Sequence, residues 1–146
     1  MPRPAEQDLQ LIVKANASGI EHLVSQVRAK LLSWPVPPPI AHEILIITDE
    51  LASNIVRHAW HDGMKNSFTY ALSLRSSRAG SEISVLLRDN GVAFDPTQHR
   101  LTVLDKVIDE RKPGGNGLAL VQGLADELQY CRLKSENNVR VTQSLL

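Results

Sequence analysis

The sequence has very little cysteine: Cys131 is the single one among 146 residues. One cysteine cannot form an intramolecular disulfide, so a disulfide-stabilised secreted domain is excluded and a reducing compartment is indicated. No apolar run reaches the roughly 18 residues of a membrane-spanning helix, and the N-terminal MPRPAEQDLQ lacks the apolar stretch of a signal peptide. These absences predict a soluble protein of the cytoplasm.

The chain also has no excess of charge of either sign, because sixteen basic residues are balanced by sixteen acidic ones. Nucleic acids and anionic membranes attract basic surfaces, so neither is expected as the main partner. A bound nucleotide must therefore be held by local geometry and not by a broad positive field. Hydrophobic residues at 42% and charged residues at 22% are ordinary for a folded protein, and the length predicts one domain over 1–146.

Apolar periodicity and turn residues predict the order of helices and strands. The expected helices cover 19–33, 39–60 and 117–128, and the expected strands cover 9–16, 68–76, 82–89, 128–135 and 139–145. The glycine of His61–Gly63 should end the second helix, Glu136–Asn138 should form the last hairpin turn, and 95–113 should be a long loop. Helices on one face of a mixed, mostly antiparallel sheet make an α+β two-layer sandwich.

Three short segments carry polar residues in arrangements that suit chemistry, the first being DELASNIVRHAW on the second expected helix. Glu50 and Asn54 lie four residues apart, so both project from one helix face, with His58 next along. A carboxylate can polarise an attacking hydroxyl or water, and an amide oxygen suits a hard cation such as magnesium. The same pattern is ordinary on a solvated helix face, and Asp49 should point elsewhere because it lies about 100° round the helix.

The second segment, LLRDNGVAFDP, ends an apolar strand with Asp89 and turns the chain at Asn90 and Gly91. A carboxylate at a strand end, next to a glycine that lets a ligand approach the backbone, can accept the exocyclic amine of adenine. Val92 and Phe94 would supply an apolar surface for a flat base. A plain Asp-Asn-Gly turn is the alternative.

The third segment, KPGGNGLALVQGLADELQY, places three glycines within four residues at a helix start. Backbone N–H groups at a helix N-terminus bind phosphate and gain from the helix dipole. The spacing matches neither a Walker A loop nor G-x-G-x-x-G, and a flexible linker is the alternative. Arg111 and Lys112, just upstream, could reach a terminal phosphate or could be ordinary surface charge.

In this order, the segments ELASNIVRHAW, RDNGVAFDP and GGNGLALVQGLADELQY resemble the GHKL (Bergerat-fold) ATPases. Among them the chain is most similar, over essentially its whole length, to the anti-sigma-factor serine kinases of the RsbW and SpoIIAB type. The resemblance implies ATP and Mg²⁺ as cofactors. It also implies that Glu50 is the catalytic base and that Asn54 is the magnesium ligand. Asp89 would accept the adenine amine, with Gly91 beside it. Further nucleotide contacts would come from Gly115, Asn116, Gly117 and Leu118, and 95–113 would form the lid.

The resemblance further implies a kinase that phosphorylates a serine or threonine of a STAS-domain antagonist protein. In its other state such a kinase binds a sigma factor, commonly as a homodimer. A non-catalytic ATP-binding anti-sigma or adaptor module, and a switch kinase controlling a phosphatase regulator, stay open as alternatives. A detached histidine-kinase catalytic domain is disfavoured, because about eight residues precede the first expected strand, too few for a phosphoacceptor hairpin.

The sequence departs from this family's pattern in two places. Ala93 stands where many relatives have a second glycine after the aspartate. Val139 and Arg140 occupy the region of the last strand where a threonine often lies near adenine, and Thr142 comes two residues later. The role of that threonine is therefore assigned to no residue of this chain.

Overall fold

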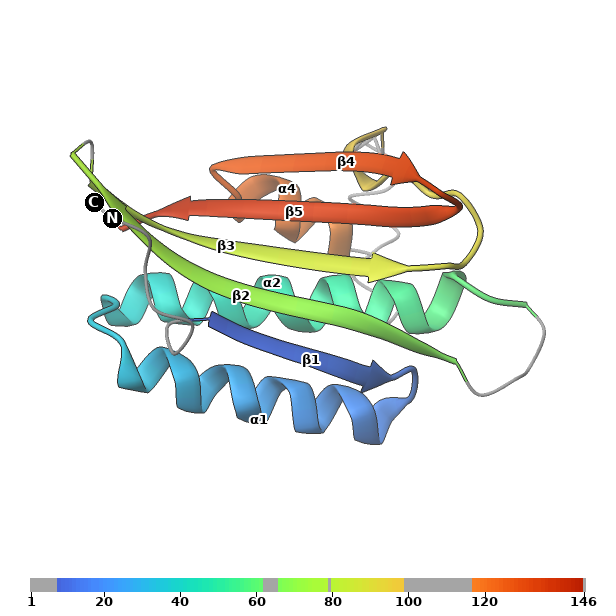
Figure 1. Cartoon of the computed structure of the whole chain (residues 1–146), viewed down its shortest axis with the longest axis horizontal. Coiled ribbons are helices and arrows are strands. Elements are labelled where there is room, and N and C mark those ends of the chain that lie inside the picture. Colours follow the sequence, from blue (N-terminus) through green and yellow to red (C-terminus); the bar gives the residue numbers. More distant parts are fainter. Residues whose placement is uncertain (1–7, 62–65, 79, 99–116, 146) are drawn as a thin grey trace.

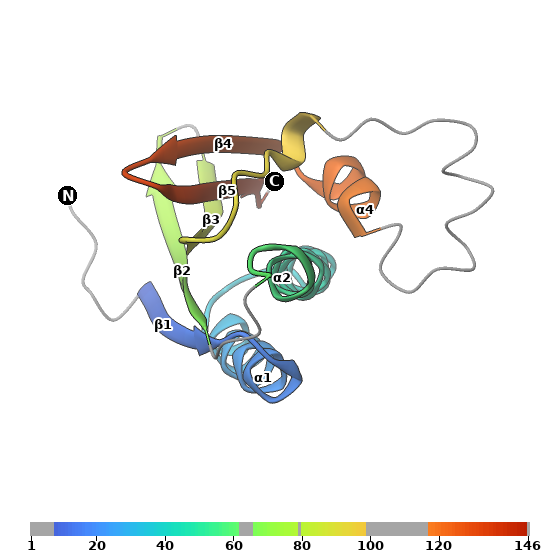
Figure 2. The same ribbon diagram turned by 90° about the vertical axis from the view of Figure 1, so that its right-hand side faces the viewer.

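The computed structural model describes residues 8–61, 66–78, 80–98 and 117–145 as an α+β two-layer sandwich. Five strands form one sheet in the order β1-β2-β3-β5-β4, and helices α1, α2 and α4 cover the same face of it (Figures 1 and 2). The elements are β1 (Asp8–Lys14), α1 (Ala17–Ser33), α2 (Pro38–His58), β2 (Ser67–Ser77), β3 (Gly80–Asp89), η2 (Pro96–Gln98), α4 (Gly117–Leu124), β4 (Glu127–Leu133) and β5 (Glu136–Ser144). The predicted class is confirmed, although each pairing in this sheet is antiparallel, so the sheet is not mixed.

Helix α1 is fixed at its start by the turn from β1. The Asn16 side chain accepts a hydrogen bond of 2.7 Å from the Gly19 amide, which is the usual way in which an N-cap satisfies a helix end. Gly19 has no room for a side chain, because a Cβ there would lie 1.9 Å from the Lys14 carbonyl oxygen. The buried side chains of the helix are Leu23, Val27 and Leu31.

Helix α2 lies between α1 and α4 (Figure 2) and carries two of the predicted site residues, Glu50 and Asn54. Pro38 is its first residue, a position where proline forfeits no helical hydrogen bond. Its buried stripe consists of Ile44, Ile47, Thr48, Leu51, Ala52 and Ile55. The predicted end by a glycine is wrong, because the helix ends at His58, well before Gly63, which lies outside the described residues. Instead, the Ala59 carbonyl accepts the Val92 amide at 2.8 Å from the segment after β3.

The hairpin of β2 and β3 supplies the centre of the core. The predicted strands at 68–76 and 82–89 are confirmed, and the side chains that face the helices are buried in alternation: Phe68, Tyr70, Leu72, Leu74, Ile83, Val85 and Leu87. One polar pair lies in this core, where the hydroxyl groups of Thr48 and Tyr70 form a hydrogen bond of 2.7 Å. Burial raises the pKa of Tyr70, so its hydroxyl stays protonated.

Helix α4 is shorter than predicted, because it ends at Leu124 and not at 128. Hydrogen bonds to β5 hold the next residues in the sheet: the Asp126 amide donates to the Gln143 side chain at 2.6 Å, and the Asp126 carboxylate accepts the Ser144 amide at 2.7 Å. The apolar residues after 124 therefore continue as strand β4. None of the helices in the described ranges is long and apolar enough to cross a bilayer.

The last hairpin turns earlier than predicted. Lys134 and Ser135 form its tip, with φ angles of 52° and 65°, which suit a two-residue hairpin turn. Glu136–Asn138 were predicted as the turn but belong to β5. As a result Asn137 lies within the sheet, paired with Asp89 of β3.

We expect Thr48→Val to lower the free energy of unfolding by about 1–3 kcal/mol, because it leaves the buried Tyr70 hydroxyl without its partner. Urea unfolding of Thr48→Val, Tyr70→Phe and the double variant would measure the coupling between the two side chains. The double variant should lose less stability than the sum of the single variants. Strict additivity would contradict a stabilising hydrogen bond between these groups.

Candidate functional site

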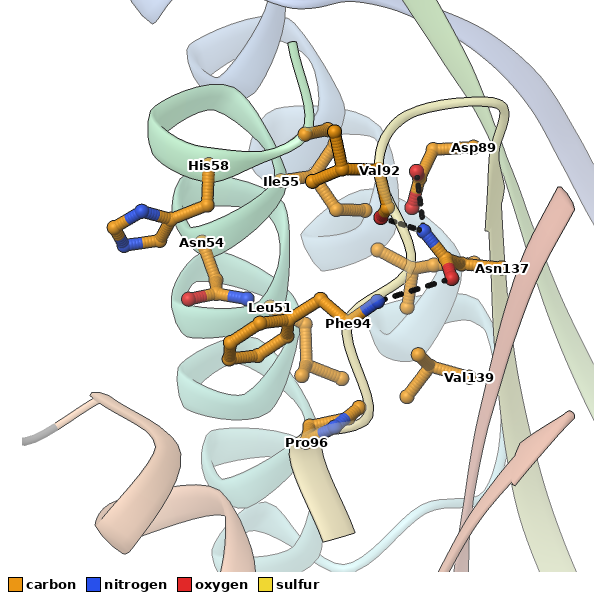
Figure 3. Close-up of a pocket in the computed structure, with 12 residues that line it drawn as sticks. Leu51, Asn54, Ile55, His58, Asp89, Val92, Phe94, Pro96, Asn137 and Val139 are labelled. Carbon is orange, nitrogen blue, oxygen red and sulfur yellow. Dashed lines mark hydrogen bonds between the residues drawn. The ribbon is translucent and has the colours of Figure 1, made fainter. Parts of the chain in front are cut away.

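A small pocket lies between helix α2, the end of β3, residues 90–96 and β5 (Figure 3). Its apolar lining includes Leu51, Ile55, Leu87, Val92, Phe94 and Val139, and its polar groups are Asn54, His58, Asp89 and Asn137. Apolar walls with a few placed polar groups are typical of small-molecule sites. The open volume of about 30 Å³ has room for one or two water molecules, so the pocket in this structure is smaller than a flat base.

Asp89 is the central acceptor of this pocket. It is 5% exposed, and its Oδ1 accepts the Gly91 amide at 2.9 Å and the Asn137 amide at 3.0 Å. Its Oδ2 has no hydrogen-bond donor among the described residues. Buried carboxylate oxygens are normally satisfied, so this oxygen is suited to an N–H donor of a ligand. An open acceptor of this kind is what the predicted role of Asp89 requires, and that role stays a prediction.

Asn137 is the residue that sequence reasoning missed. It is 3% exposed, and its Nδ2 donates to Asp89 Oδ1 and, at 2.8 Å, to the Val92 carbonyl (Figure 3). It was overlooked because asparagine favours turns. A signal was present, since the inward alternation of Val139, Val141 and Gln143 extends back to 137 with a period of two.

Gly91 allows the segment after β3 to pass directly against the end of α2. A Cβ at this position would lie 2.3 Å from the Ala59 carbonyl oxygen, and the neighbouring Val92 amide donates to that same oxygen. The glycine is therefore required by close backbone approach. The Gly91 amide also donates to Asp89 Oδ1, and the part of Gly91 in nucleotide binding stays a prediction.

The structure also brings Glu50 of α2 to the start of α4. A Cβ on Gly117 would lie 2.4 Å from Glu50 Oε2, so the absence of a side chain makes room for the carboxylate. Burial raises the pKa of Glu50, and the neighbouring Asp49 raises it further, while Arg57 opposes both. Two predicted site residues from distant segments thus lie in contact.

Asn54 and His58 continue the same face of α2 into the pocket (Figure 3). The Asn54 amide makes no hydrogen bond to another described residue, so its oxygen is available to a cation. The His58 ring stacks on Phe94 with centroids 6.2 Å apart. Burial lowers the pKa of His58, and Arg57 lowers it further.

The structure describes only some of the remaining residues that were predicted to contact the nucleotide. Leu118, the second residue of α4, is buried at 7% exposure. Gly115, Asn116, Arg111 and Lys112 lie outside the described residues, as does most of the predicted lid at 95–113. The described part of that lid ends with the short helix η2.

Comparisons with known proteins agree with this architecture. Residues 14–143 match the family model of the histidine kinase-like ATPase domain. The serine/threonine-protein kinase BtrW of Bordetella bronchiseptica is 35% identical to the chain over 99 residues, which cover 68% of this chain and 67% of BtrW.

Two solved structures share the fold. The RsbU and RsbW domains of Rv1364c from Mycobacterium tuberculosis align with a TM-score of 0.69 at 16% identity, over 99% of this chain and 33% of that one. The SiaB-SiaC complex from Pseudomonas aeruginosa aligns with a TM-score of 0.65 at 17% identity, over 94% of this chain and 90% of that one. This chain thus spans about a third of the mycobacterial chain, and both likenesses concern the fold alone.

We expect Gly91→Ala to lower the free energy of unfolding by about 1–3 kcal/mol, because its methyl group would overlap the Ala59 backbone. Gly123→Ala is the matched control, since a Cβ on that α4 glycine meets nothing within 4 Å. The control should gain about 0.5–1 kcal/mol from the higher helix propensity of alanine. Thermal and urea unfolding would compare the two variants, and equal stabilities would contradict the close approach at Gly91.

Proposed function

This chain belongs to the histidine kinase-like ATPase family, and we propose that it is an ATP-dependent serine/threonine-protein kinase that acts as an anti-sigma factor. Its proposed substrate is a serine or threonine of a STAS-domain antagonist protein, and its alternative partner is a sigma factor. The kinase part of this proposal is supported by the 35% identity to BtrW, which is named a serine/threonine-protein kinase. The partner-switching part follows from the resemblance of its three site segments to RsbW-type kinases.

The observation that carries the proposal is the Asp89 Oδ2 atom, buried at the end of an apolar pocket without a donor among the described residues. An exocyclic amine of adenine would supply that donor, and the apolar walls would cover the faces of the base. A carboxylate accepts but cannot donate, so guanine, which presents a carbonyl oxygen at the equivalent edge, fits less well. This combination favours an adenine nucleotide.

The chain's residues also fit the triphosphate end of a nucleotide. Gly117 has no side chain, and the Asn54 side chain lines the pocket without a hydrogen-bond partner in the described part of the chain. We assign Asn54 to Mg²⁺, which usually takes one or two protein ligands and completes its shell with phosphates and water. Gly115, Asn116, Gly117 and Leu118 are assigned to the phosphates, and 95–113 to the lid. When bound, the metal nucleotide supplies the phosphoryl group and neutralises the charge that develops on it.

Glu50 is assigned as the base that accepts the proton of the substrate hydroxyl. It lies one helical turn from Asn54, so the base and the metal ligand keep a fixed separation on a rigid element. Its raised pKa makes its carboxylate a stronger proton acceptor than an exposed glutamate. A module that binds ATP without catalysis would need no base at this position, and this favours the kinase over the adaptor.

The remaining assignments concern location and assembly. We propose a cytoplasmic protein that works as a homodimer and contacts neither nucleic acid nor membrane directly. The balance of sixteen basic and sixteen acidic residues supports this choice of protein partners over polyanions.

We expect Glu50→Gln to lower phosphoryl transfer by about 10²–10⁴-fold, the usual contribution of a general base. Its affinity for ATP should stay close to that of the wild type, because the adenine pocket is intact. The measurement is transfer of labelled phosphate from ATP with magnesium to a purified STAS-domain partner, with ATP affinity taken from calorimetry. Glu21→Gln, an exposed change on α1, is the matched control. Undiminished transfer by Glu50→Gln would remove the assigned base, and a wild type that ignores ATP would overturn the function itself.

We also expect the pH profile of kcat/KM to move with the charges around Glu50. The base must be ionised, so the rate falls as pH drops through its raised pKa. Asp49→Asn removes a cause of that increase, lowers the pKa of Glu50 and extends activity to lower pH. Arg57→Gln removes the opposing charge, raises the pKa and moves the loss of activity to higher pH. Profiles that shift together in one direction would contradict this electrostatic arrangement.

A further inference from the structure

We propose that Asn137 is a specificity-determining residue, which occupies one oxygen of Asp89 so that the pocket offers the other to an N–H donor of the bound base. The inference deepens the proposed function and rests on nucleotide binding at this pocket. It concerns a residue that the family resemblance left without a role. Asn137 acts through Asp89 and is therefore a positioning residue.

The orientation of the Asn137 amide is fixed by its neighbours. Its Oδ1 accepts from the Tyr130 hydroxyl at 2.5 Å, from Arg132 Nη1 at 3.0 Å and from the Phe94 amide at 3.4 Å. Its Nδ2 faces two acceptors, Asp89 Oδ1 and the Val92 carbonyl. A flipped amide would place N–H groups against donors and oxygen against acceptors. One orientation is therefore strongly favoured.

This orientation decides which oxygen of Asp89 a ligand can use. Oδ1 already accepts from Gly91 and Asn137, so a third donor would find little free lone-pair density there. Both hydrogens of the Asn137 amide are committed as well, so Asn137 cannot itself donate to a base. Because a carboxylate oxygen repels a carbonyl, the arrangement accepts an amino edge and rejects a keto edge.

The same residue holds the outer wall of the pocket. Asn137 binds the backbone of the segment after β3 at Val92 and Phe94, and Arg132 adds a bond of 3.0 Å to the Gly91 carbonyl. Strand β5 and its neighbour β4 thus position a segment that is about 40 residues away in sequence. Removal of the Asn137 amide would therefore break its hydrogen bonds to the backbone at Val92 and Phe94 and its hydrogen bond to Asp89 at the same time.

The test measures the affinities of ATP and GTP with magnesium by calorimetry, for wild type, Asn137→Ala and Asn138→Ala. Asn138 is the matched control, because its side chain donates to the Glu136 carbonyl on the surface and touches neither Asp89 nor the pocket. We expect Asn137→Ala to bind ATP about tenfold more weakly, as the loss of a buried hydrogen bond to a charged group predicts. The preference for ATP over GTP should shrink, while Asn138→Ala stays like the wild type.

A second variant supplies a readout that a purely structural role would not move. Asn137→Asp places two carboxylates side by side at neutral pH, and their repulsion should weaken ATP binding. Acidification protonates one of the pair, which then donates to the other as the amide did, so ATP affinity should recover as pH falls. The wild type should show no such recovery over the same range, with folding checked by circular dichroism.

The outcomes separate the two proposals. If the wild type binds ATP but Asn137→Ala keeps its affinity and selectivity and only melts earlier, Asn137 is structural and the inference is overturned. If the wild type binds no adenine nucleotide, the proposed function fails instead. If Asn137→Ala does not fold, Tyr130→Phe takes its place, because it removes one of the hydrogen bonds that orient the Asn137 amide. The inference would then be overturned if Tyr130→Phe keeps the wild-type preference for ATP over GTP and the ATP affinity of Asn137→Asp does not change with pH.

Discussion

The pairing of Asp89 with Asn137 across β3 and β5 is the constraint on which the site depends. It joins the end of a strand, the segment that follows it and the last hairpin through one buried amide. A carboxylate buried to 95% would be costly without such partners. Among the described residues only its Oδ1 receives donors, so Asp89 keeps its place in the sheet while Oδ2 stays an open acceptor. The fold and the proposed adenine site therefore rely on the same hydrogen bond.

Much of the fold could be predicted because the hydrophobic pattern matches the element periods. Leu23, Val27 and Leu31 mark α1 at helical spacing, and the alternation around Tyr70 and Val85 marks the central hairpin. The errors occur where long-range hydrogen bonds decide the boundary. Asp126 bonds to residues of β5 that are 17 and 18 positions away, and no local pattern reveals those bonds. The predicted helix extended to 128 because the apolar pattern after the glycines continues, but hydrogen bonds to β5 place the residues from 127 in the sheet.

In the candidate site too, residues on one element could be placed from the sequence, whereas contacts between distant segments could not. The spacing of Glu50 and Asn54 on one helix face is a local property, so the sequence was enough to place them together. Asn137 needed the hairpin turn to be located first, and a shift of the turn by two residues changed it from a loop residue into a buried strand residue. The contact between Glu50 and Gly117 joins two segments more than sixty residues apart, which no spacing rule could supply.

That contact gives Gly117, the first residue of α4, a second explanation. A glycine at a helix N-terminus is usually explained by phosphate approaching the backbone, but here the atom above Gly117 is a carboxylate oxygen of the protein itself. A phosphate and a carboxylate would compete for the same positive end of the helix dipole. The gap at Gly117 thus makes room for the Glu50 carboxylate, and under the proposed function the same gap would also have to admit a phosphate.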